Sequence, residues 1–403
     1  MHPAASSDPG VYPGAGQGAL SGRQSRRPLP ALTGIRCFAA LNLVFFHFSN
    51  PRWFGPFAPV VDGGYISVSF FLLLSGFILT YNYSGRAEKG QLNAHSFWLA
   101  RFSRLYPVYL FSLLLSAGML VAEFHAQSRV NFTLGLILTP LLLQGWHPIV
   151  STFWNTPAWT MSTEAFFYVL FPWLVTRKRP RRRGGLLLLM LAFWICGLIL
   201  PALYIHFNPD GIAHPDRYTS GFWIRVLKFM PMQHLPSFLF GMALAYFDDL
   251  TPRASRVRLA AGILGFAALY VVLLRGDRMP YVLMHDGLLM PLFAGVILCL
   301  AGQNAVSSFF GFFPFIAIGE ASYCLYLLHF NLWNMLHSSG LLEKSGLIAF
   351  DPWLSYVLLV AIALLTKRFV ERPLRGWILR RFSTKKPASS PAAEPAPAIA
   401  AAS

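Results

Sequence analysis

Ten apolar stretches, each long enough or nearly long enough to cross a membrane, recur along this chain of 403 residues. A hydrocarbon core about 30 Å thick needs roughly 20 apolar residues in a helix, and backbone polar groups are satisfied there only in helices or closed barrels. Hydrophobic residues make up 55% of the chain and charged residues 12%, about half the charged share of a soluble domain. We therefore predict an all-α polytopic membrane protein with about ten transmembrane helices. These helices are expected near residues 32–49, 64–82, 105–123, 158–176, 185–206, 231–248, 258–274, 281–301, 313–336 and 352–370.

One further apolar segment, residues 131–143, is too short for a comfortable span and contains Pro140. If it does not cross, all strongly basic loops fall on one side, with 24 Lys and Arg there against 8 on the other side. Because such positive charge concentrates in cytoplasmic loops, we expect both termini to be cytoplasmic. Residues 130–157 would form a re-entrant or surface segment outside, and 207–230 a second outer excursion. This asymmetry accounts for the net charge of +17 without nucleic acid as a partner.

The two ends of the chain have compositions that cannot bury a core. Residues 1–30 are polar and rich in Gly, Ala and Ser, and residues 383–403 are rich in Pro and Ala. We predict that both are disordered cytoplasmic tails. The intervening residues 31–382 would form one membrane domain, whose first span acts as an uncleaved signal-anchor.

The four cysteines all lie inside apolar stretches and lack the spacing of a metal site. We interpret Cys37, Cys196, Cys299 and Cys324 as small buried hydrophobic residues. No metal centre is expected.

Arg36 and His47 share the first apolar stretch, where ionisable side chains cost free energy and usually mark a functional site. Eleven residues at 3.6 per turn place both side chains on nearly the same helix face. The rise between them is roughly 16 Å, about half the hydrocarbon thickness. This geometry favours a long phosphorylated donor threaded along one helix.

Glu164 and His329 are expected in the outer half of their spans, at a depth similar to His47. A histidine paired with a carboxylate can act as a general base, because the carboxylate orients the ring and stabilises the imidazolium. We therefore predict His47 and Glu164 as catalytic residues. The alternative for each residue is a buried polar group satisfied by a structural hydrogen bond.

Arg101 and Arg104 lie three residues apart in a predicted cytoplasmic segment, hence on one helix face. With Arg36 they would form a cluster of guanidinium groups suited to phosphate oxygens. The alternative is membrane anchoring by charge alone. Ser75 and Gly76, in the middle of a span, favour close helix packing; backbone approach to a ligand is the alternative.

Six motifs, in order between about residues 30 and 380, resemble those of acyltransferase family 3, a family of integral membrane acyltransferases. The chain departs from the family at Ala165, where many members have a second acid, and it has one additional residue before Ser75. The resembling residues are Leu32, Gly34, Arg36 and His47; Phe70, Phe71, Ser75, Gly76 and Phe77; Arg101, Arg104, Leu105 and Pro107; Trp159, Thr160, Met161, Ser162 and Glu164; Ser322, Tyr323, Tyr326, Leu327 and His329; and Glu371, Arg372 and Pro373.

The resemblance implies transfer of an acyl group, commonly acetyl, from acyl-coenzyme A to a hydroxyl group. It associates the three arginines with the donor and His47 with catalysis. Acyl-CoA would be a co-substrate, with no tightly bound cofactor, and the acceptor would be a glycan or a small molecule. The expected location is the bacterial inner (plasma) membrane. Further candidates for site residues are Ser75, Gly76, Trp159, Ser322, Tyr323, His329, Glu371 and Arg372.

Three other functions remain open from the residues alone. One is acylation of a lipid or of a small secondary metabolite such as a macrolide. Another is a transporter or flippase that moves substrate without acyl transfer. The third is a non-catalytic scaffold, which would leave Arg36, His47 and Glu164 without a reason to be buried.

Overall fold

The computed structural model describes residues 26–383 apart from the side chain of Asp277, and the described part is helical throughout, with no β-strand. Short 3-10 turns join several helices, and a π-helical turn, Lys367–Glu371, connects α17 to α18. The helices are α1 (Pro30–Phe48), α2 (Ala58–Asp62), α3 (Ile66–Glu88), α4 (Ala94–Leu115), α5 (Met119–Ala126), α6 (Arg129–Leu138), α7 (Trp159–Val175), α8 (Arg183–Phe207), α9 (Phe222–Phe229), α10 (Leu235–Asp249), α11 (Arg256–Leu274), α12 (Tyr281–His285), α13 (Met290–Leu300), α14 (Ala305–Phe310), α15 (Phe313–Ser338), α16 (Leu341–Lys344), α17 (Trp353–Thr366) and α18 (Arg372–Phe382).

Seven helices in the described part are long and apolar enough to cross a membrane, or eight if the bent pair α4 and α5 forms one span. The expected count of about ten is therefore not reached. Two of the expected spans are the helices α7 and α10, which have 17 and 15 residues and are short for a bilayer about 30 Å thick. The span expected at 105–123 is bent by 73° between α4 and α5.

The two expected outer excursions contain only short helices. In the first, α6 has 10 residues and would rise only about 15 Å, so it is too short to cross a bilayer. In the second, α9 has eight residues, and Trp223 on it is half exposed. With eight residues this helix is also too short to cross a bilayer, in agreement with an excursion there.

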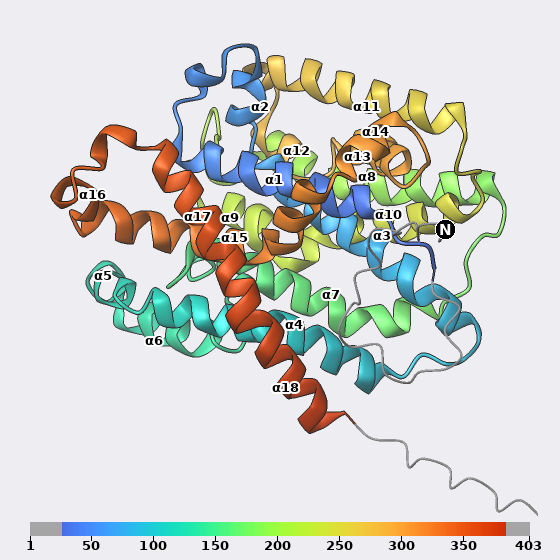
Figure 1. The fold of residues 1–403 in the computed structure, drawn as a ribbon. Coiled ribbons are helices and arrows are strands. Elements are labelled where there is room, and N and C mark those ends of the chain that lie inside the picture. The colour runs from blue at the N-terminus through green and yellow to red at the C-terminus, as the bar shows by residue number, and fades with distance from the viewer. Residues whose placement is uncertain (1–25, 384–403) are drawn as a thin grey trace, which may run out of the picture.

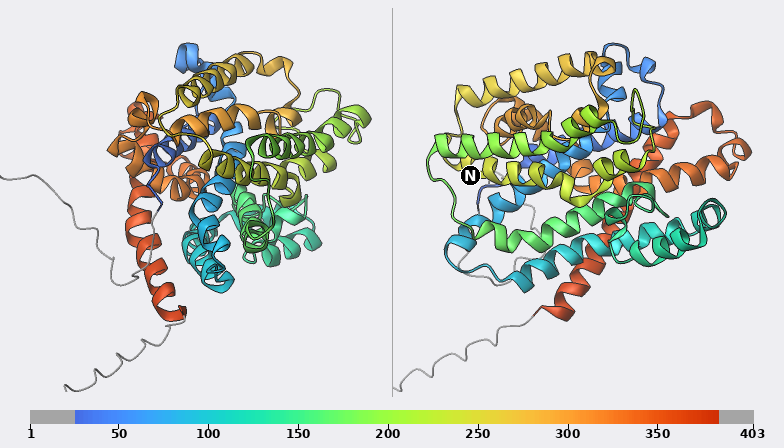
Figure 2. Two further views of the ribbon diagram at one scale, coloured as in Figure 1. Left: turned by 90° about the vertical axis from the view of Figure 1, so that its right-hand side faces the viewer. Right: turned by 180° about the vertical axis from the view of Figure 1, so that it is seen from behind.

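Most long helices run in a common direction and form a bundle, with α1 passing through its middle (Figure 1). The most extensive helix contacts join α1 to α15, α3 to α10 and α11 to α13. The views from the side and from behind show the same bundle, from which α18 projects (Figure 2). The first helix is thus surrounded by later segments and reaches both ends of the bundle.

Local sequence signals set several of these helix ends. Pro30 begins α1, where its missing N–H costs nothing. The side chain of Asn93 accepts a hydrogen bond from Ser96 N at 2.8 Å and caps α4. These ends fix the register in which α1 and α4 present their arginines.

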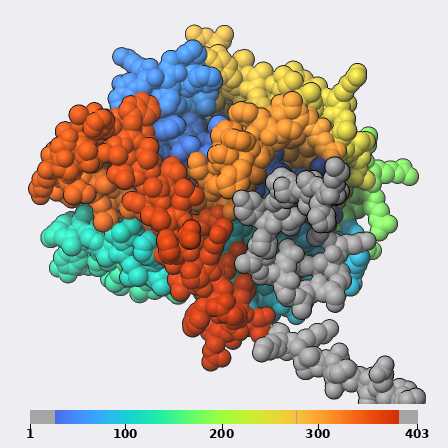
Figure 3. Space-filling view, in the orientation of Figure 1, coloured from blue at the N-terminus to red at the C-terminus, as the bar shows by residue number. Residues whose placement is uncertain are grey.

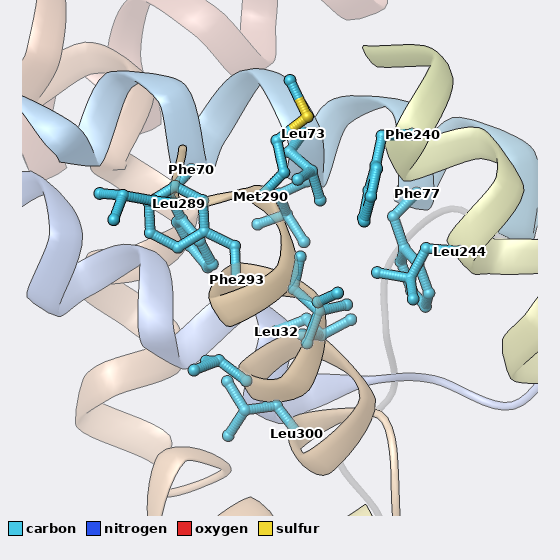
Figure 4. Close-up of a cluster of buried hydrophobic side chains, with 14 of the residues drawn as sticks. Leu32, Phe70, Leu73, Phe77, Phe240, Leu244, Leu289, Met290, Phe293 and Leu300 are labelled. Atoms are coloured by element: carbon cyan, nitrogen blue, oxygen red, sulfur yellow. The ribbon is translucent and has the colours of Figure 1, made fainter. Parts of the chain in front are cut away.

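A large apolar core lies between α1, α3, α10 and α13. Figure 4 shows its side chains interdigitating from these helices, with Phe70 and Phe77 of α3 facing partners from α13 and α10. Such close packing holds the helices in one arrangement. The core therefore positions α1 and α3, both of which contribute to the site described below.

Two glycines allow α3 and α10 to touch backbone to backbone. A Cβ at Gly76 would lie 2.1 Å from Phe238 O, and one at Gly241 would lie 2.0 Å from Leu73 O. Gly76 thus permits close helix packing, the interpretation favoured from the sequence. Its neighbour Ser75 lines a pocket inside the bundle.

The C-terminal helices α17 and α18 cross one face of the molecule (Figure 3).

Three of the four cysteines are buried, as expected, but Cys196 is exposed on α8. The interpretation of all four as buried is therefore wrong for Cys196, because most of the surface of α8 is turned away from the bundle.

The predicted disordered tails lie largely outside the described residues, which begin at residue 26 and end at residue 383. Residues 1–25 and 384–403 therefore remain predictions. Within the described part, Arg26 donates to Asp249 Oδ1 at 2.7 Å and to Ser84 Oγ at 3.1 Å. The chain is thus attached to the ends of α3 and α10 before α1 begins.

We predict that Gly76→Ala and Gly241→Ala each lower the free energy of unfolding by about 1–3 kcal/mol, because the added methyl group meets a fixed backbone carbonyl. Thermal unfolding of detergent-purified protein measures the effect. The matched control is Gly85→Ala, also on α3, where a Cβ meets nothing within 4 Å and alanine favours the helix. Equal melting temperatures for all three variants would contradict the close contact of α3 with α10.

Candidate functional site

One pocket inside the bundle brings together residues from five helices that are far apart in the sequence. Its walls come from α1, α3, α4, α7 and α15. Seven of the predicted site residues line it: Arg36, Ser75, Arg101, Arg104, Glu164, Ser322 and Tyr323.

The three arginines enter the pocket from two helices. Arg101 and Arg104 lie one turn apart on α4, and Arg36 lies near the start of α1. Arg101 donates to Tyr83 Oη at 3.1 Å, whereas Arg36 and Arg104 make no hydrogen bond or ion pair with another described residue. Two guanidinium groups therefore keep their N–H donors available to a bound group.

The only acid that lines this pocket is Glu164, and its Oε2 accepts a hydrogen bond from Tyr168 Oη at 2.6 Å. One carboxylate among three guanidinium groups leaves an excess of two positive charges. Unpaired charges in an apolar surrounding are costly, and bound phosphate oxygens would compensate them. The pocket is therefore suited to an anion.

The pocket has a volume of about 120 Å³, below the ~300–1,000 Å³ typical of small-molecule sites. Apolar side chains such as Leu72, Leu79 and Met161 complete its walls. A small pocket with apolar walls and a cationic lining fits part of a ligand that carries an anionic group. It does not fit a whole nucleotide.

His47 and His329 lie against each other at the far end of α1. Their ring centroids are 5.3 Å apart, and the ring planes are inclined by 29°. His47 is exposed, whereas His329 is fully buried. The structure thus joins α1 and α15 through two imidazoles, a lateral contact that the sequence does not reveal.

The buried ring of His329 has a defined tautomer. Its Nδ1 lies 2.5 Å from Tyr326 O, and because a carbonyl only accepts, Nδ1 carries the proton. The other nitrogen, Nε2, is buried and has no partner among the described residues. A neutral ring therefore presents a free lone pair beside His47.

Tyr326 connects the pocket to the histidine pair. Its ring lines the pocket and lies 5.9 Å from the His329 ring. The Tyr326 hydroxyl is held by Pro157 O at 3.1 Å and Thr160 Oγ1 at 3.2 Å. Neither histidine lines the pocket itself, so Tyr326 stands between the arginines and the imidazoles.

Comparison with known proteins agrees with this arrangement of motifs. The family model of acyltransferase 3, described as an acyltransferase domain, matches residues 29–366. The chain belongs to acyltransferase family 3.

The chain is also similar to several named acyltransferases. The acyltransferase MdmB of Streptomyces mycarofaciens is 28% identical over 236 residues, covering 54% of this chain and 57% of that protein. The O-acetyltransferase OatA of Staphylococcus aureus (strain NCTC 8325 / PS 47) is 26% identical, covering 87% of this chain and 58% of that protein.

The peptidoglycan O-acetyltransferase OatA of Listeria monocytogenes is also 26% identical, covering 88% of this chain and 57% of that protein. The chain therefore spans somewhat more than half the length of these relatives. No solved structure matches it.

Other predicted residues of this acyltransferase family 3 chain lie outside the pocket. Glu164, by contrast, lines the pocket with the arginines, and although it was predicted to orient His47 it makes no hydrogen bond to His47 within the described part. Glu371 is buried and accepts from Cys324 Sγ at 3.5 Å. Arg372 lies 3.7 Å from Glu320 on the exposed side.

Trp159, the first residue of α7, belongs to a different cluster. Its ring is 5.3 Å from His234 and 6.3 Å from His285. Sequence reasoning did not select either histidine, because both lie on short connecting segments with no motif around them. Tyr168 was also not predicted as a site residue. It lies four residues after Glu164, and this spacing places both side chains on the same face of a helix.

We predict that a cysteine at position 47 reacts with a membrane-impermeant maleimide from outside the cell, because His47 is exposed and its end of α1 is expected outside. In a Cys196→Ser background, His47→Cys should label in intact cells. The matched variant His95→Cys, exposed near the start of α4, should label only after permeabilisation. Labelling at 95 but not 47 in intact cells would reverse the predicted orientation.

Proposed function

We propose that this chain is a membrane O-acyltransferase that takes an acyl group, most simply acetyl, from acyl-CoA at the cytoplasmic side. The acceptor is a hydroxyl group of a cell-surface or exported carbohydrate. The observation that carries the proposal is the pocket that Arg36, Arg101, Arg104 and Glu164 line together. It supplies a cationic entrance and an apolar passage directed towards two imidazoles.

The donor would bind with its phosphates at the arginines and its nucleotide outside the pocket. A passage of about 120 Å³ accepts the thin pantetheine arm but not the adenosine. The rise of roughly 16 Å between Arg36 and His47 is comparable in length to such an arm. The thioester would then meet Tyr326, with His329 and His47 beyond it.

His47 would act as the general base. Its ring takes the proton from the acceptor hydroxyl as that oxygen attacks the thioester carbonyl. The tetrahedral intermediate collapses, the carbon–sulfur bond breaks, and the thiolate recovers the proton as free thiol. The products are an ester and coenzyme A. His329, with its Nδ1 held by Tyr326 O, would position the His47 ring by stacking against it.

The choice of acyl group and acceptor rests on the relatives. The Staphylococcus and Listeria proteins are named O-acetyltransferases, and the latter is a peptidoglycan O-acetyltransferase. These names favour acetyl and a surface glycan. The alternative acceptors are a lipid or a small secondary metabolite.

We predict that purified protein in nanodiscs releases free thiol from acetyl-CoA and that His47→Ala lowers the rate by about 10²-fold or more, the usual contribution of a general base. A thiol-reactive chromophore measures the release. His95→Ala, an exposed histidine at the other end of the bundle, should retain the activity. Substrate movement across the membrane without thiol release would indicate a transporter instead.

Arg104→Gln should raise the KM for acetyl-CoA by roughly 10- to 100-fold, because a hydrogen bond to a charged group contributes about 1.5–3 kcal/mol. The control is Arg181→Gln, since Arg181 is an exposed arginine on the same predicted face that does not line the pocket. Unchanged donor KM in the Arg104 variant would remove the phosphate assignment.

A further inference from the structure

A second and larger pocket opens at the other end of the bundle, near the His47 end of α1. Its volume is about 590 Å³, inside the ~300–1,000 Å³ range of small-molecule sites. It is built from α2 and the segment after it, the end of α8, the connection from α8 to α9, the end of α11 and the segment that leads into α12. No predicted site residue lines it.

This pocket shares a wall with the residue next to His47. The guanidinium of Arg217 lies 4.8 Å from the centre of the Phe46 ring, and the Tyr65 ring lies 5.8 Å from it. Phe46 in turn contacts His47, at 4.8 Å between ring centroids. The wall of the pocket thus reaches, through Phe46, the imidazole that we propose as the base.

Aromatic faces and free hydroxyl groups dominate the chemistry of the pocket. Four tyrosines line it: Tyr65, Tyr204, Tyr218 and Tyr281. The rings of Tyr65 and Tyr281 are 5.0 Å apart, and their hydroxyls make no hydrogen bond to another described residue. Such phenols offer an apolar face and a hydrogen-bonding group together, which is the chemistry of a sugar ring and its hydroxyls.

Two charged side chains in the pocket wall, Arg217 and Asp216, have hydrogen-bond partners, and Arg278 lines the wall as well. Arg217 donates to Asp62 Oδ1 at 2.9 Å. Asp216 Oδ1 accepts from the backbone nitrogens of Tyr218 and Thr219, both at 2.9 Å. The lining thus contains both signs of charge beside the free tyrosine hydroxyls, which suits a polyol that carries no strong charge of its own.

A buried network holds the two sides of the pocket together. Lys228 Nζ donates to the carbonyls of Arg217 at 3.0 Å and Thr219 at 2.8 Å, which fixes the connection between α8 and α9. Burial lowers the pKa of Lys228 to about 8, so its ammonium is retained at pH 7. The backbone carbonyl of Lys228 continues the network to His234.

His234 and Asp286 form a buried ion pair behind the tyrosines. His234 Nε2 lies 3.1 Å from Lys228 O, and Nδ1 lies 3.0 Å from Asp286 Oδ1. The His234 ring thus bridges the backbone carbonyl of Lys228 and the carboxylate of Asp286. The other oxygen of Asp286 lies 3.4 Å from His285 Nδ1. His285 in turn supports the tyrosines, with its ring 6.4 Å from Tyr65 and 5.6 Å from Tyr281.

We propose that this outer pocket binds a neutral glycosyl unit of the acceptor, with Tyr65 and Tyr281 as its principal contacts. The inference rests on the proposed acyl transfer and assigns the acceptor site. The glycosyl unit can belong to a glycan or to a glycosylated small molecule, because both present the same ring. The His234–Asp286–His285 network positions the tyrosines and does not touch the ligand.

The test uses the full chain in nanodiscs at pH 7. Saturation-transfer NMR measures binding of methyl β-glucopyranoside and methyl N-acetyl-β-glucosaminide without donor, and initial rates give the KM for the acceptor at saturating acetyl-CoA. The double variant Tyr65→Phe/Tyr281→Phe removes two hydroxyls and should raise acceptor KM about 10-fold or more, with the donor KM unchanged. Tyr270→Phe is the control, since its hydroxyl bonds to Pro56 O away from the pocket.

Loss of glycoside binding in the double variant, with binding kept in the Tyr270 variant, supports the pocket. Better transfer to a soluble oligosaccharide than to a glycosylated metabolite identifies a glycan as the source of the ring, and the reverse identifies a small molecule. Thiol release without glycoside binding, or efficient transfer to a hydroxyl lipid without a sugar, overturns the pocket assignment while the acyl-transfer proposal stands. Absence of thiol release with every acceptor overturns both.

Discussion

The confinement of three guanidinium groups with one carboxylate inside an apolar bundle is the constraint from which the rest follows. Arg36 and Arg104 have no partner among the described residues, and Glu164 is engaged by Tyr168. Burial of charge is tolerated in membranes where it faces a cavity and serves a ligand. An anion entering between α1 and α4 would complete the charge balance, and phosphates on a long acyl donor are such an anion. The position of α1 then directs the donor towards the histidines.

Trp159 relates the two pockets to each other. It begins α7 and packs on His234 and His285, which support the outer pocket. The next residue, Thr160, lines the arginine pocket and holds Tyr326. The start of α7 is thus shared by the proposed donor and acceptor sites. A single rigid helix end would keep both substrates in register with His47.

Much of the fold follows from hydropathy, and part of the site follows from spacing along single helices. Arg101 and Arg104 could be placed on one face because three residues make nearly one turn. Counting residues from a loop predicted a depth for Glu164 similar to that of His47, whereas Glu164 lines the pocket with the arginines. Contacts between helices were beyond the sequence. The stacking of His47 on His329 and the packing of Trp159 on His285 join residues more than a hundred positions apart, and no motif records such a contact. The outer excursion at 207–230 was predicted, but the segments from other parts of the chain that close a pocket around it were not.

A structure determined in nanodiscs with a non-hydrolysable acetyl-CoA analogue would test the arrangement most directly. We predict density for phosphate groups against Arg36, Arg101 and Arg104, with the pantetheine arm in the passage between α1 and α4 and its acyl end next to Tyr326 and His329. An analogue bound in the outer pocket, or lying with its phosphates at the His47 end of α1, would contradict a donor that enters from the arginine side.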